Sequence, residues 1–117
     1  MDKFIVTLPL TGEYLTTVRL TTGGLCALSG FDVDTAEDYK VCVTESLLIL
    51  KRNGFENAKI TFTVGQALGC LVEGENIVAK PQTAIEDDIS RALLTALVGE
   101  VDFKTEDGRV VTIQFEG

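Results

Sequence analysis

Apolar residues recur at helical spacing from Asp34 to Gly54, around most of the circumference of one predicted helix. At about 100° per residue, the polar side chains fall in a single narrow stripe, made of Glu37, Lys40, Thr44 and Lys51. Asp34 and Glu37 have the spacing of a capping box, and Asn53-Gly54 is typical of a helix end. Because the rest of the surface is apolar, we expect this helix to pack against neighbours on more than one side.

Glu45 lies outside the polar stripe of this helix. Its neighbours one turn away are apolar or small, namely Val41, Cys42, Leu48 and Ile49. In one interpretation the carboxylate is buried with partners or faces a cavity, because an unpaired buried charge costs several kcal/mol. In the other, the helix is rotated enough for Glu45 to reach water or to pair with Arg52 or Lys59.

Short apolar runs predict a set of strands. They cover residues 3–8, 59–64, 68–72, 101–104 and 109–115, with a short addition at 77–79. Gly65-Gln66 and Glu106-Asp107-Gly108 are turn signals. The strands at 59–64 and 68–72 are therefore predicted to form one hairpin, and the strands at 101–104 and 109–115 a second. In the final strand Val111, Ile113 and Phe115 alternate and would form the buried face. The segment Glu73-Gly74-Glu75-Asn76 predicts a loop.

Two further helices are predicted. The first begins with Thr11 as N-cap and ends near Ser29-Gly30, and its Gly23-Gly24 pair marks a kink or a close helix contact. The other begins with the capping-box pair Thr83 and Glu86 and ends before Gly99. Its apolar positions, expected to pack inward, are Ile85, Ile89, Leu93 and Leu97, with Ala92 and Ala96 beside them.

The order of elements indicates the fold class. It reads strand-helix-helix-strand-strand-helix-strand-strand. This order predicts a single α+β domain over residues 1–117, a two-layer sandwich. Its sheet would be mixed and mostly antiparallel, with three helices on one face.

Composition and net charge exclude several kinds of catalytic site and binding partner. The chain has 117 residues, three cysteines, no histidine and a net charge of −8. Without histidine, Ser-His-Asp and Cys-His catalysis and His-based zinc sites are excluded. The negative charge argues against nucleic acid or an anionic membrane as partner. Cys26, Cys42 and Cys70 lie in apolar patterns and are expected to be reduced core residues, and with no leader visible we expect a cytoplasmic protein.

Four stretches resemble the anti-sigma factor serine kinases, small bacterial GHKL (Bergerat-fold) ATPases related to histidine kinase ATP-binding domains. These stretches are Leu8-Pro9 with Tyr14 and Val18-Arg19-Leu20; residues 38–45; the hairpin at 60–72; and residues 89–101 with Asp107-Gly108 and 111–113. The resemblance covers nearly the whole chain. It implies that Glu45 matches the family's catalytic base and that Arg19 matches an arginine that contacts protein partners.

The chain departs from this family at three elements of the ATP site. Ile49 stands where the family has an asparagine that holds Mg²⁺. The family's Asp-x-Gly-x-Gly loop, whose aspartate binds adenine, is replaced by residues 72–76. The glycine-rich stretch before the last helix is replaced by residues 83–88, in which Glu86, Asp87 and Asp88 would repel phosphates. The acidic residues at 73–76 and 86–88 could instead hold a cation, although a solvated surface is the simpler interpretation.

The resemblance and the departures together predict an anti-sigma-factor-like regulator that acts by protein binding, with a vestigial Glu45 and no cofactor. Its partner would be a sigma factor or a STAS-type anti-anti-sigma protein, and it could form a homodimer through its first helix and sheet edge. An exposed apolar patch involving Leu15, Leu20 or Leu47 is then expected. The alternatives are a divergent serine kinase that uses Mg-ATP on a STAS-type protein, and a domain that has kept only the fold.

Overall fold

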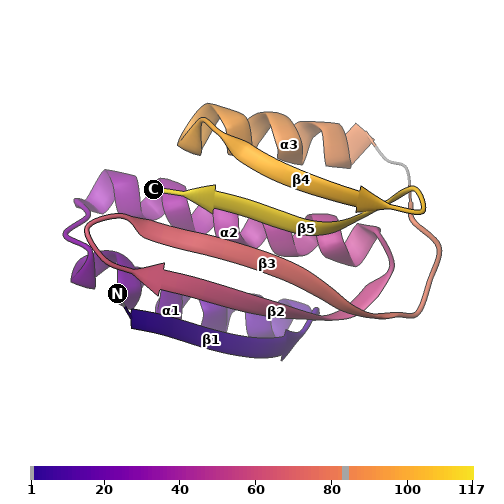
Figure 1. The fold of residues 1–117 in the computed structure, drawn as a ribbon, viewed down its shortest axis with the longest axis horizontal. Helices are drawn as coiled ribbons and strands as arrows, with labels where there is room; N and C mark the ends of the chain where they lie inside the picture. The colour runs from indigo at the N-terminus through magenta and orange to yellow at the C-terminus, as the bar shows by residue number, and fades with distance from the viewer. Residues whose placement is uncertain (1, 83–84) are drawn as a thin grey trace.

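Five strands and three helices make up the computed structural model, which describes residues 2–82 and 85–117. In chain order they are β1 (Asp2–Pro9), α1 (Gly12–Leu28), α2 (Val33–Arg52), β2 (Phe55–Val64), β3 (Leu68–Ile77), α3 (Ile85–Val98), β4 (Val101–Glu106) and β5 (Arg109–Glu116). The strands form one sheet in the order β1-β2-β3-β5-β4 (Figure 1). Every neighbouring pair is antiparallel, so the predicted mixed sheet is wrong.

The helix α2 lies at the centre of the molecule. It packs on β2, β3 and β5, with α1 on one side and α3 on the other (Figure 1). This arrangement is compatible with a two-layer α+β sandwich. Among the described residues, no helix is long and apolar enough to cross a membrane.

Burial around α2 confirms that it has neighbours on more than one side. Its fully or almost fully buried side chains are Tyr39, Cys42, Val43, Ser46, Leu47, Ile49 and Leu50. Those of the sheet include Ile60, Phe62, Cys70, Val72 and Ile113. The three cysteines are free and buried, as expected, and desolvation raises the pKa of the Cys42 thiol to about 12.

The predicted N-terminal cap of α2 is wrong by two residues. Asp32 is the N-cap, and its side chain accepts a 2.8 Å hydrogen bond from the backbone N–H of Thr35. Asp34 lies in the first turn, and Glu37 pairs with Lys40 at 2.9 Å. The helix starts earlier because Asp32 supplies both the extended backbone and the acceptor that a cap requires.

The ends of the helices otherwise follow the predicted signals. Gly30, Gly54 and Gly99 all have positive φ, between 76° and 91°, as expected of residues just beyond a helix. Thr11 is the N-cap of α1, although its side chain makes no capping hydrogen bond. At Gly23 a Cβ atom would lie 2.9 Å from Cε of Lys40, so this glycine marks a close contact with α2, whereas a Cβ atom at Gly24 would meet no neighbour.

The segment Glu73-Gly74-Glu75-Asn76 is not a loop but the second half of β3. Strand β2 begins at Phe55, earlier than expected, and pairs Lys59 with Glu73 and Phe55 with Ile77. The Phe55 ring fills the space that a Cβ atom at Gly74 would need. The glycine that suggests a loop in the sequence therefore makes room for an aromatic ring.

The inward face of α3 differs from the predicted one. Its buried residues are Ser90 and Leu94, whereas Ile85 and Ile89 are 72% and 61% exposed. Leu93 and Leu97 are only partly buried. The proposed cap residue Thr83 lies outside the described residues.

The corrected cap of α2 can be tested with two neighbouring aspartates. Replacing Asp32→Ala should lower the melting temperature by a few degrees, because it removes the acceptor for the first turn. Asp34→Ala, the matched control, should have little effect. If Asp34→Ala is the more damaging change, the cap assignment is wrong.

The same cap has a pH dependence. The N–H of Thr35 holds the pKa of Asp32 below its usual value. The stabilisation is therefore present above the ordinary pKa of an unfolded aspartate and is lost as the pH falls through the lowered pKa. The difference in melting temperature between the wild type and Asp32→Ala should shrink in that acidic range.

Candidate functional site

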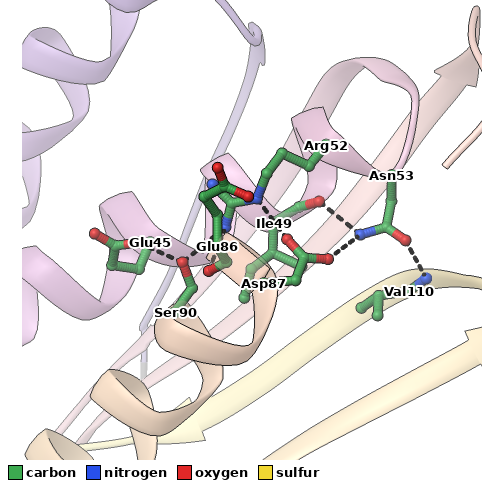
Figure 2. Close-up of polar contacts among 8 residues, drawn as sticks. All are labelled: Glu45, Ile49, Arg52, Asn53, Glu86, Asp87, Ser90 and Val110. Atoms are coloured by element: carbon green, nitrogen blue, oxygen red, sulfur yellow. Dashed lines mark hydrogen bonds and ion pairs between the residues drawn. The ribbon is translucent and has the colours of Figure 1, made fainter. Parts of the chain in front are cut away.

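A chain of polar side chains joins the C-terminal half of α2 to the first turns of α3 (Figure 2). Ser90 donates a 2.7 Å hydrogen bond to Oε2 of Glu45 and accepts one of 2.7 Å from Nη2 of Arg52. The Nε of Arg52 forms an ion pair with Asp87. Glu45 is half-buried and reaches Arg52 only through Ser90, so the predicted direct pairing with Arg52 or Lys59 is wrong.

Asn53 continues this network from α3 to the sheet. Its Nδ2 donates to the carbonyl of Ile49 at 2.8 Å and to Oδ2 of Asp87 at 3.1 Å. Its Oδ1 accepts a 2.9 Å hydrogen bond from the backbone N–H of Val110 in β5 (Figure 2). Because Asn53 is only 4% exposed, these partners replace the water that its amide would otherwise bind.

The connection between β3 and α3 is held against the C-terminal end of α2. Arg109 donates from Nη1 to the carbonyls of Asn53 and Ala79, at 2.6 and 3.0 Å. The N–H groups of Val78 and Gln82 donate to the carbonyls of Gly54 and Arg52, each at 2.8 Å. These contacts require a glycine at position 54, because a Cβ atom there would overlap the Ala79 carbonyl.

The position that matches the family's metal-binding asparagine is part of the core. Ile49 follows Glu45 by one turn and has no exposed surface. An amide does occur one further turn along, at Asn53, but it is committed to Asp87 and Val110. Among residues 2–82 and 85–117, no three Asp, Glu or Cys side chains come together to hold a metal ion.

The two acidic segments have ordinary structural surroundings. Glu73 and Glu75 lie in β3, opposite Lys59 and Asn57 of β2. In the other segment, Asp87 is held by Arg52 and Asn53, while Glu86 and Asp88 are exposed.

Hollows on the surface of the described residues include two of notable size. One, of about 420 Å³, is bounded by the start of α3 and the tip of the β4–β5 hairpin, and Asn53, Asp87 and Arg91 are among its lining residues. The guanidinium of Arg91 lies 4.6 Å from the centroid of the Phe103 ring. The other, of about 1070 Å³, runs along the sheet over Thr61, Thr63 and Leu71. Glu45 is not among the residues that line either hollow.

The structure separates the two residues that the resemblance singles out. Arg19 is exposed on α1, on the other side of α2 from α3 (Figure 1). Of the three leucines expected in an exposed patch, Leu20 is 76% exposed, Leu15 is partly buried and Leu47 is fully buried. The inclusion of Leu47 was wrong because that part of α2 faces the core.

Ser90, Arg52 and Asp87 were not expected to act together, and their roles have only weak signals in the sequence. Ser90 lies outside the apolar repeat of Ile85, Ile89, Leu93 and Leu97, so the sequence gives no reason to place it on the buried face of α3. The sequence marks Asn53 only as a helix end. Its bonds to α3 and β5 join residues 34 and 57 positions apart, which no local pattern predicts.

Replacement of Asn53 should test how much this network stabilises the fold. Asn53→Ala leaves the buried N–H of Val110 without a partner, so the free energy of unfolding should fall by about 2–3 kcal/mol. Asp88→Ala, an exposed control on the same turn as Asp87, should change it by less than about 0.5 kcal/mol. Urea denaturation measures both. Equal losses in the two variants would show that the Asn53 amide stabilises the fold no more than an exposed side chain does.

Comparison with known proteins identifies no family for this chain. No protein-family model matches the chain, and no curated protein matches it. The contacts between α2 and α3 and the exposed faces of the helices therefore carry the functional inference.

Proposed function

We propose that this protein is an anti-sigma-factor-like regulator that acts by binding another protein and has no working ATP site. The observation that carries the proposal is the direct α2–α3 network. In the kinases that the sequence resembles, the glutamate matched by Glu45 works beside a metal ligand and a glycine-rich stretch. Here its carboxylate accepts a hydrogen bond from Ser90, and its neighbour Ile49 is buried.

A nucleotide placed between α2 and α3 would have to displace existing contacts. Ser90 is 3% exposed and is held by both Glu45 and Arg52. Hydrogen bonds to charged groups contribute about 1.5–3 kcal/mol each, so their loss would weaken nucleotide binding. The start of α3 also presents Glu86, Asp87 and Asp88, whose charges repel a triphosphate.

The surface that we assign to partner binding is the outward face of α1. Leu20 and Leu28 are 76% and 74% exposed, and the helix carries only two charged residues, Glu13 and Arg19. Such a face is unusual on a chain with a net charge of −8. Exposed apolar surface beside a single arginine suits a protein partner. We propose a sigma factor or a STAS-type anti-anti-sigma protein as that partner.

One observation favours a second candidate, a divergent kinase. The hollow beside Asp87 and Asn53 adjoins the network and is large enough, at about 420 Å³, for a small ligand. This candidate requires that Mg-ATP bind there and that a STAS-type protein receive the phosphoryl group.

A thermal melt with millimolar Mg-ATP or Mg-ADP separates the two candidates. A nucleotide at about 100 times its dissociation constant would stabilise the fold by about 2.7 kcal/mol, a shift of several degrees. We expect no shift with either nucleotide. A reproducible shift that disappears in Asp87→Ala would support the kinase instead.

The partner surface can be tested by titration against purified sigma factors and STAS-type proteins. Leu20→Glu should weaken binding by at least about tenfold, because it places a charge in an apolar contact. Arg19→Ala should also weaken it. Lys104→Glu on β4, at the far edge of the sheet, is the control and should bind like the wild type. If no protein of these classes binds at micromolar concentration, the proposed partner is wrong.

A further inference from the structure

The helix α3 has a second apolar face that points away from the protein. Ile85 and Ile89 are 72% and 61% exposed, and Ala92 and Ala96 are exposed as well. At about 100° per residue, these four positions fall within an arc of about 60°. The buried residues Ser90 and Leu94 lie on the opposite side of the helix. We call the four outward residues the α3 stripe.

We propose that the α3 stripe binds the same stripe of a second copy of this chain, with the two helices antiparallel. A two-fold axis between positions 90 and 91 places Ile85 opposite Ala96 of the other copy, and Ile89 opposite Ala92. Each large side chain then meets a small one, so the two stripes are complementary in shape. The alanines let the helix axes approach to about 8 Å, the close end of the range for packed helices.

The charges near the stripe allow a second copy to bind there. Two chains of net charge −8 repel each other, and this repulsion is weakest where neither chain presents charge. The stripe itself is uncharged. In the same antiparallel alignment, each flank of the stripe faces the same flank of the other copy, so Glu86 lies nearest Leu93 and Asp88 nearest Thr95, and no carboxylate lies directly opposite another. Antiparallel alignment also places the helix dipoles in their favourable orientation.

The size of the stripe sets the strength of the contact. It runs over 12 residues, from Ile85 to Ala96, whose ends lie about 16 Å apart along the helix. One helix pair of that length buries less than the roughly 1,200 Å² of the smallest stable interfaces. The dimer is therefore weak and reversible. It also leaves α1 free, because α1 and α3 lie on opposite sides of α2 (Figure 1). The inference does not depend on the proposed function.

Sedimentation equilibrium of the purified chain tests the proposal. Between about 10 µM and 1 mM, the range of weak interfaces, the apparent mass should rise from monomer towards dimer. Added salt should strengthen the association, because it screens the repulsion between chains and leaves the apolar contact intact. Ile89→Glu should raise the dissociation constant by at least about tenfold. Leu20→Glu, which changes an exposed leucine on α1, is the control and should dimerise like the wild type.

A mixing experiment tests the register. Ile89→Glu and Ala92→Lys should each be monomeric alone, because each places two charges in the apolar contact. Mixed together, they should form a heterodimer, since the carboxylate introduced at 89 then faces the ammonium introduced at 92. Thermal melts check that each variant is folded, and Ala96→Glu replaces Ile89→Glu if that variant is not.

Three results would overturn the proposal. One is a wild-type chain that stays monomeric to 1 mM at every salt concentration, by the scale of weak interfaces. Another is a dimer that survives Ile89→Glu, which would place the contact elsewhere, and its loss in Leu20→Glu would assign it to α1. The third is a mixture of the two α3 variants that remains monomeric, which would exclude the antiparallel register.

Discussion

The side-chain amide of Asn53 joins three elements that are far apart in the sequence. It holds the last turn of α2, the first turn of α3 and the start of β5 through Ile49, Asp87 and Val110. A buried amide with four hydrogen-bonding positions is expensive to leave unpaired, so these elements must meet at one place. The position of α3 relative to the sheet therefore depends more on this polar contact than on its apolar residues.

That dependence explains why α3 has apolar residues on two sides. Contacts of Ser90 and Asp87 with Arg52 turn one face of the helix towards α2. Leu94 follows them into the core, and Ile85 and Ile89 are left facing water. A helix oriented by apolar burial alone would have turned the isoleucines inward. The polar network thus takes up the space between α2 and α3 and, at the same time, creates an exposed apolar stripe.

The sequence predicts the fold class better than it predicts the site. The central helix, its stop at Asn53-Gly54 and the last hairpin all carry local signals that the structure confirms, including positive φ at Asp107 and Gly108. The cap of α2 was wrong because two aspartates two residues apart both suit an N-cap. The second half of β3 is not predicted, because glycine and asparagine usually indicate loops. Here Gly74 lies in a strand because the Phe55 ring of the neighbouring strand needs the space of its missing side chain. The α2–α3 network could not be predicted, since its partners are at least 34 positions apart.

The three cysteine thiols can serve as probes of local opening of the structure. Cys26, Cys42 and Cys70 lie in α1, α2 and β3, and all are buried with raised thiol pKa values. A thiol reagent can therefore reach each one only when the packing around it opens. Since α1 packs mainly on α2 and carries Gly23 and Gly24, we expect it to open more readily than the sheet. Labelling rates would thus resolve the motion of α1 from global unfolding, without any added probe.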